Sequence, residues 1–184
     1  MVRQLAGAIC CALMLLAGCA GLRPAGSGIE LTGSDDAAAV TVLTERLRAA
    51  GLPVEAAAST SSLFVYRAGR ATLLSPVLQN EGLDRIIGAR SYAPAAGQDE
   101  AAVAALAARL NDGLNVASFK VAAGALLMET NLTFLDRLSV DEVLAFLDWL
   151  DAVELAIRRV DDEQRVLLLS ATAGPGGPGA TPRR

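Results

Sequence analysis

The amino-acid sequence predicts an α+β fold in which an antiparallel sheet packs against helices. Segments with apolar residues at helical spacing lie near the start, the middle and the end of the chain. Between them lie short β-rich runs bounded by turn residues. No internal repeat interrupts this order. The expected order of elements is helix, three strands, helix, two strands, helix.

The first helix is expected to follow Ser34, a suitable N-cap residue. Asp35 and Asp36 then place negative charge at the positive end of the helix dipole. Gly51 closes the helix, and Pro53 follows soon after it. The residues expected on its apolar face are Val40, Leu43, Leu47 and Ala50.

Four β-rich runs follow, of which the first is short and is not counted among the three expected strands. Their expected ranges are Pro53–Ala57, Leu63–Tyr66, Ala71–Leu78 and Leu83–Tyr92. Ala68 and Gly69 offer a turn between the second run and the third. Pro76 predicts that its strand is irregular or lies at a sheet edge. Gly88 predicts a break or bulge in the last run.

A second helix and a hairpin are expected next. The helix covers about Asp99 to Asn111 and ends at Gly113. Apolar and polar residues alternate over Ala117–Val121, as in a half-buried strand. Gly124 marks the turn, and Ala125–Asn131 forms the returning strand.

The last helix has the clearest signals. Ser139 and Glu142 form a capping box, which Leu138 and Val143 flank as a hydrophobic staple. Its apolar stripe comprises Val140, Val143, Leu144, Leu147 and Leu150, and Phe146, Trp149 and Val153 widen that stripe. Such a wide apolar face predicts core packing. The alternative is that part of it contacts a partner protein.

The N-terminus resembles the signal of a bacterial lipoprotein. Arg3 precedes an apolar stretch over Leu5–Ala17, which is shorter than a membrane-spanning helix needs. The stretch ends in Leu16-Ala17-Gly18-Cys19, which resembles the lipobox. The resemblance implies cleavage between Gly18 and Cys19 and lipid attachment to Cys19, and Ala20 then favours an outer-membrane lipoprotein facing the periplasm. The alternative is an ordinary secretory signal followed by an incidental cysteine.

These features divide the chain into four parts. Residues 1–18 are the expected signal peptide, 19–33 a flexible tether, 34–165 the α+β domain, and 174–184 a disordered Gly/Pro tail. Loss of residues 1–18 leaves 166 residues with 15 basic and 20 acidic side chains, a net charge of −5. This balance argues against a nucleic-acid partner. The chain has no histidine, and Cys19 would be the last cysteine, so Cys and His zinc sites are excluded.

Several short stretches are consistent with a known family. They are Gly51-Leu52-Pro53-Val54-Glu55, Leu110-Asn111, Phe119 with Gly124, and Leu138-Ser139. With the order of elements, they resemble the YbjN-type domain, a bacterial sensory-transduction-regulator family, over about Asp35 to Arg159. The resemblance implies a fold similar to that of type III secretion chaperones. It implies no catalytic residues, and a cytosolic chaperone role does not carry over to a lipid-anchored chain.

Few residues suggest chemistry, and no cofactor is expected. Ser118 and Lys120 fall on one strand face, where a solvated surface is a better interpretation than a nucleophile pair. Asp161-Asp162-Glu163 is interpreted as a solvated helix end, because it lacks the ligand spacing of a calcium loop. Four residues are candidates either for a partner surface or for an ordinary surface: Asp84, Arg85, Arg90 and Tyr92.

The function expected from these observations is a non-enzymatic protein-binding or chaperone-like module. The membrane, through lipidated Cys19, and an envelope protein are its expected partners. The alternative is a structural accessory lipoprotein, similar to a pilotin, in a secretion or pilus assembly. An enzyme is a distant third interpretation, since no catalytic motif is present.

Overall fold

The structure is a computed structural model that describes residues 28–31, 35–57, 61–79, 83–135, 137–162 and 164–168. Six antiparallel strands form the main sheet in the order β2-β3-β4-β5-β7-β6. Their bounds are β2 Val54–Ala56, β3 Leu63–Arg67, β4 Arg70–Val77, β5 Asp84–Tyr92, β6 Ser118–Ala122 and β7 Ala125–Phe134. The expected α+β class is confirmed. The signal segment, Cys19 and the Gly/Pro tail lie outside the described residues.

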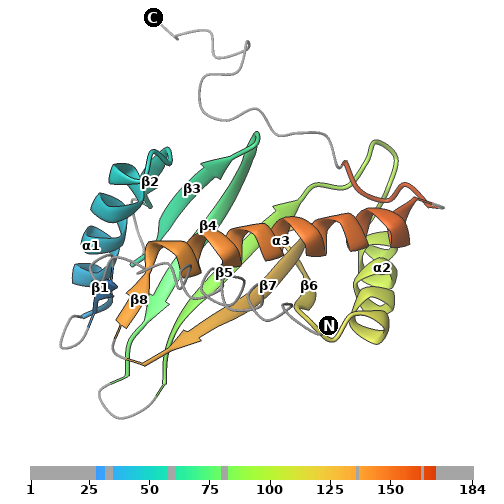
Figure 1. Cartoon of the computed structure of the whole chain (residues 1–184). Helices are drawn as coiled ribbons and strands as arrows, with labels where there is room; N and C mark the ends of the chain where they lie inside the picture. The colour runs from blue at the N-terminus through green and yellow to red at the C-terminus, as the bar shows by residue number, and fades with distance from the viewer. Residues whose placement is uncertain are drawn as a thin grey trace, which may run out of the picture.

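Three helices cover one face of this sheet (Figure 1). They are α1 Asp36–Ala49, α2 Glu100–Gly113 and α3 Val140–Asp161. Leu74, Gly88 and Thr130 are aligned across three strands and therefore share a face. Gly88 lies against α3, since a Cβ atom added there would meet Phe146. At the other end of the same face, α2 packs on β6 and β7.

The opposite face of the sheet carries no helix among the described residues. Alternation along β7 places Leu127 and Glu129 on this face, whereas Leu126 and Met128 are fully buried under the helices. Lys120 on β6 also lies on the helix-free face, where its Nζ is 2.6 Å from Oε2 of Glu129. The interpretation of Ser118 and Lys120 as a solvated strand face is therefore confirmed.

A second, two-stranded sheet includes part of the segment expected to be a flexible tether. Strand β1, Gly28–Glu30, pairs antiparallel with β8, Arg137–Ser139. Ile29 and Leu31 are fully buried, because they pack into the same core as Leu138. The prediction that all of 19–33 is a flexible tether was therefore wrong for residues 28–31. The folded domain begins before residue 34.

The helix caps agree with the sequence signals at the start of α3 and differ at the start of α1. Oδ1 of Asp35, not Ser34, accepts the hydrogen bond from the backbone N–H of Ala38 at 2.7 Å. Asp35 adopts extended backbone angles and is the N-cap of α1, while Ser34 lies outside the described residues. The expected capping box of Ser139 and Glu142 is confirmed at the start of α3.

Two strand interruptions were expected, at Gly88 and at Pro76, and neither breaks the pairing of β4 with β5 or of β5 with β7. Strand β5 is continuous through Gly88, with unbroken register to β4 and β7, so the expected break was wrong. Glycine stands there because α3 approaches closely. Pro76 lies within the regular strand β4, beyond Leu74, where the pairing with β3 ends. Its missing N–H therefore costs no bond between strands.

The chain continues past α3 and returns to the sheet. Backbone bonds link Ala95 N–H to the Val166 carbonyl at 2.8 Å and Leu168 N–H to the Ala93 carbonyl at 2.8 Å. Asp161 is 2% exposed, and its carboxylate accepts bonds from the N–H groups of Val166 and Leu167. Asp161 therefore fixes a turn and is not part of a solvated helix end, and the folded part extends beyond residue 165. Glu163 lies outside the described residues.

No helix in the described part of the chain is long and apolar enough to cross a membrane.

Candidate protein-binding site at the free edge of strand β7

A buried ionic cluster joins α3 to the sheet. Glu154 is 3% exposed, and three guanidinium groups surround its carboxylate. Arg70 Nε lies 2.6 Å from Oε2, Arg158 Nη2 lies 2.7 Å from Oε1, and Arg90 Nη1 lies 3.4 Å from Oε2. The cluster therefore ties β4 and β5 to the middle of α3.

Arg90 has further partners within the same layer. Its Nε donates to Oγ1 of Thr72 at 2.9 Å, and its Nη2 lies 2.7 Å from Oδ1 of Asp151. Burial raises the pKa of the neighbouring Tyr92 well above its usual value, and the charge of Glu154 adds to this effect. Because each carboxylate of the cluster is paired with arginine, we assign the cluster to holding α3 in place.

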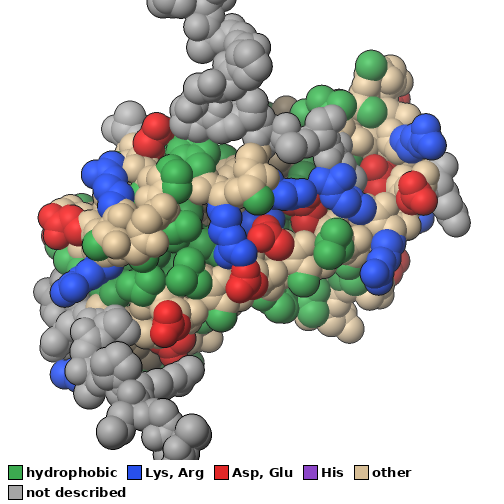
Figure 2. Space-filling view, turned by 45° about the horizontal axis from the view of Figure 1, so that its top comes forward, with side chains coloured by type: hydrophobic (Ala, Val, Ile, Leu, Met, Phe, Trp, Pro, Cys, Tyr) green, Lys and Arg blue, Asp and Glu red, His purple; other side chains and the backbone are tan. Residues whose placement is uncertain are grey.

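The charges at the surface are mixed in sign. Arg67 pairs with Asp148 and lies 3.7 Å from Asp151, beside the buried cluster. Figure 2 shows acidic and basic side chains intermingled across the middle of one face, with hydrophobic side chains next to them. The face shown in Figure 2 carries no single-sign stripe of the kind that binds nucleic acid.

The residues first considered for a partner surface are mostly interior. Arg90 and Tyr92 are buried. Asp84 is 7% exposed, and its carboxylate accepts a bond from the Gln79 N–H at 2.9 Å. Only Arg85 is partly exposed. Both interpretations open for these residues, a partner surface and an ordinary surface, are therefore excluded for three of them, because Asp84, Arg90 and Tyr92 lie under the helices.

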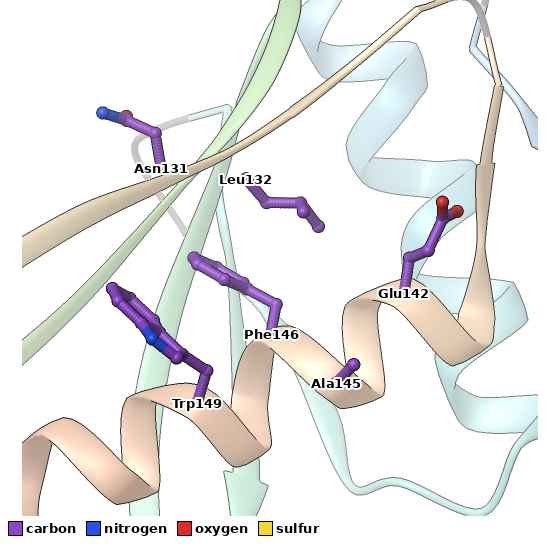
Figure 3. A pocket seen from close by; sticks show the side chains of 6 residues that line it. All are labelled: Asn131, Leu132, Glu142, Ala145, Phe146 and Trp149. Atoms are coloured by element: carbon purple, nitrogen blue, oxygen red, sulfur yellow. The ribbon is translucent and has the colours of Figure 1, made fainter. Parts of the chain in front are cut away.

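An apolar pocket lies between β7 and α3. It has a volume of about 310 Å³ and is open to solvent on one side. Its lining residues are Asn131, Leu132, Glu142, Ala145, Phe146 and Trp149. Figure 3 shows the Phe146 and Trp149 side chains rising from α3 toward β7, with Asn131 directed away from them. We call this the aromatic pocket.

The two aromatic rings have a defined arrangement. Their centroids lie 6.2 Å apart with an angle of 14° between the planes, which is an offset stack. Phe146 is nearly buried because its ring packs on the backbone of Gly88, whereas Trp149 is partly exposed. The buried ring thus supports the exposed one. This arrangement presents a rigid apolar surface to solvent.

Beside the pocket, strand β7 has a free edge. Strand β6 pairs with β7 only over Ala125–Glu129, whereas β5 pairs with it over Leu126–Phe134. Beyond Glu129, no other strand among the described residues pairs with β7 on the β6 side. Unpaired edges of this kind are recognised templates for another strand.

The hairpin identifies which backbone groups are free. Ala123 and Gly124, with φ of 50° and 75°, form a two-residue turn, so Ala122 and Ala125 exchange hydrogen bonds. Odd-numbered residues of β7 then direct their N–H and C=O groups toward the β6 side. Asn131 and Thr133 therefore direct four backbone groups toward a side where no strand in the described part of the chain pairs with them. We call these groups the free β7 edge.

Exposed apolar side chains flank this edge. Leu135, which is 69% exposed, follows β7, and Val116, which is 44% exposed, precedes β6. The Val116 carbonyl accepts a bond from Oγ1 of Thr130 at 3.2 Å, which places it at the other end of the edge. Asn131, which carries part of the free β7 edge, also lines the aromatic pocket, so the pocket and the edge form one region.

The sequence pointed to only part of this region. Trp149 belonged to the wide apolar face of the last helix, for which partner contact was the stated alternative. The free edge was missed, since the returning strand was expected to end at Asn131 and extends to Phe134. The available signal was the alternation of Asn131, Leu132 and Thr133 beyond the length of the preceding strand.

No metal site and no relative supplies a function. The described residues contain no group of three or more Cys, Asp or Glu side chains placed to hold a metal ion. Comparison with protein-family models, with curated proteins and with solved structures finds no match to this chain. The resemblance to the YbjN-type domain therefore stays a prediction. Any functional argument depends on the geometry of the chain itself.

Proposed function

We propose that this chain is a non-enzymatic protein-binding module held at the bacterial envelope by a lipidated Cys19. The observation that carries the proposal is the aromatic pocket beside the free β7 edge. Aromatic side chains in a partly exposed apolar site are typical of protein-binding hot spots. The pocket has one ionisable residue, Glu142, whose carboxylate accepts bonds from the N–H and Oγ of Ser139.

The lipobox resemblance supports the location. Lipoprotein cysteines carry two or three acyl chains in the family that the motif resembles, and two lipid signals are enough for stable anchoring. Ala20 favours the outer membrane over the inner one. The proposed setting is therefore the periplasmic side of the envelope.

Cells that express the chain are expected to incorporate labelled palmitate into it. The variant Cys19→Ser should incorporate none, because it removes the only thiol outside the expected signal peptide. Cys10→Ser is the matched control, since Cys10 would leave with the signal, and it should label like the natural protein. Palmitate labelling that survives Cys19→Ser would contradict lipidation at this position.

Photo-crosslinking in cells tests the binding role. A benzophenone amino acid replacing Trp149 is expected to capture one dominant envelope protein at a fixed ratio. The same amino acid replacing Lys120, on the helix-free face, is the control and should capture it at least tenfold less. Equal capture of many proteins from both positions would contradict the proposal. A large complex that is lost on deletion of this chain would favour the accessory, pilotin-like alternative.

A further inference from the structure

We propose that the free β7 edge binds an extended segment of a partner protein as an added strand. This inference deepens the proposed function and rests on it. It further specifies the backbone hydrogen bonds and the side-chain pattern that the partner must supply. The mode is strand addition, in which main-chain bonds provide affinity and pockets for alternate side chains provide specificity.

The backbone groups define the register of the added strand. Asn131 and Thr133 each offer one N–H and one C=O toward the vacant side. Two residues of the partner, separated by one, therefore form four hydrogen bonds with them if the added strand is antiparallel. The residue between those two lies opposite Leu132. Its own N–H and C=O groups point away from β7.

The pleat then defines the side-chain pattern. Side chains opposite each other on neighbouring strands share a face, so the central partner residue lies on the helix side with Leu132. That side holds the aromatic pocket, which suits a large apolar side chain. The two flanking residues lie on the helix-free face beside Asn131 and Thr133, where polar side chains fit. The expected partner segment is thus a bulky apolar residue between two polar, β-forming residues.

The available space fits a short segment. The open stretch runs from Thr130, which is tied to the Val116 carbonyl, to Leu135, which forms a bridge with Arg137. A strand rises about 3.3 Å per residue, so this stretch accommodates about five residues. Val116 and Leu135 supply apolar contacts at its two ends.

A second copy of this chain fits the edge poorly. In an antiparallel pair of β7 strands, the β6 of the second copy would lie end to end with the β7 of the first copy, because β6 and the free edge are on the same side of β7. That β6 would run into the turn at Leu135–Arg137. The edge therefore favours an extended segment without a neighbouring strand on its binding side.

Pro76 in β4 shows that this sheet tolerates proline at a position equivalent to Thr133 in β7. Pro76 lies in β4 with its nitrogen toward a vacant side, and β4 still pairs regularly with β5. Thr133→Pro should likewise remove one outward N–H while leaving the pairing of β7 with β5 intact. Thr133→Val is its matched control, because it keeps the backbone donor and the β-branched shape.

The experiment selects phage-displayed random twelve-residue peptides on the full-length protein in detergent micelles. We expect enriched peptides with a large apolar residue between polar, β-forming residues. Their affinity should fall at least tenfold on Trp149→Ala and on Thr133→Pro, and should change less than twofold on Thr133→Val. Circular dichroism checks that each variant is folded.

N-methylated versions of an enriched peptide test the backbone bonds without altering the protein. Methylation of either residue flanking the apolar one should reduce affinity at least tenfold. Methylation of the apolar residue itself should have little effect, because its N–H points away from β7. This pattern distinguishes a strand from a helix or a loop in the pocket.

The opposing outcomes are separable. Strand addition would be overturned if no peptide is enriched, or if N-methylation does not change the affinity of the enriched peptides. The proposed binding function would still be tested independently by crosslinking from position 149. A dimer in analytical ultracentrifugation that Thr133→Pro converts to a monomer would assign the edge to a second copy. That result would likewise overturn the proposal.

Discussion

Glu154→Gln is expected to lower the free energy of unfolding by about 3–5 kcal/mol, the range found when one partner of a buried ion pair is removed. The substitution keeps the side-chain shape but removes the charge that three arginines share. Arg70 and Arg158 retain side-chain exposures of 28% and 35%, so they can turn toward water. Arg90, with 3%, cannot, and its charge is left with Asp151 alone.

Urea denaturation followed by tryptophan fluorescence measures this loss, since Trp149 is the only tryptophan in the chain. Asp148→Asn is the matched control on the same helix. Its side chain is 64% exposed and pairs with Arg67, so its removal should cost less than about 1 kcal/mol. Equal losses in both variants would show that burial does not set the strength of the Glu154 contacts.

The double variant Arg90→Met with Glu154→Leu should recover much of the lost stability. It removes both buried charges and replaces them with apolar groups of similar length, which is often neutral for buried ion pairs. Thr72 would lose one hydrogen-bond partner, so recovery should be incomplete. A double variant no more stable than Glu154→Gln would indicate that Arg70 and Arg158 depend on Glu154 for their packing.

Gly88→Ala is expected to destabilise the domain by about 1–3 kcal/mol, the usual cost of overpacking a core. The added methyl carbon would lie 2.7 Å from Cε1 of Phe146 and 3.2 Å from Cδ1 of Leu150. Real Cβ atoms do not approach so closely, so the aromatic ring must move. Because Phe146 lies against Trp149, the same change should alter the aromatic pocket.

A second substitution makes this prediction specific. Phe146→Leu in the Gly88→Ala background should regain part of the lost stability, since it removes ring atoms from the crowded position. Gly113→Ala is the control, because an added methyl carbon there meets no atom within 4 Å. Urea denaturation of the natural protein, Gly88→Ala, Phe146→Leu and the combined variant forms a double-mutant cycle. A coupling energy near zero would contradict the proposed contact.

Local signals were sufficient for the three helices and the strands of the main sheet, but not for β1 and β8. The capping box of α3 involves residues three apart, and the hairpin turn at Ala123 and Gly124 involves neighbours, so both are encoded within a few positions. The same signals failed where the chain packs tightly. Gly88 suggested a bulge, yet the reason for glycine is a ring that lies 58 positions further along the chain.

The candidate site depends on long-range relationships that periodicity does not encode. The free β7 edge exists because β6 has five residues and β7 has ten, and because β5 pairs with β7 over Leu126–Phe134. The ionic cluster joins Arg90 to Glu154, which are 64 positions apart. Both features become visible only once the strand order and the path of α3 are known.

If Cys19 is lipidated as proposed, the pairing of β1 with β8 limits the distance between this domain and the bilayer. Gly28 lies nine positions after Cys19, and an extended chain spans at most about 3.6 Å per residue, or about 32 Å in all. Strand β8 begins three residues after β7 ends, so the free edge lies close to β1, where the segment that follows Cys19 joins the domain. With Cys19 lipidated, the edge would search a thin layer of periplasm next to the membrane. A partner anchored in the same leaflet would then meet it at a high effective concentration, and a weak strand-to-strand contact would suffice.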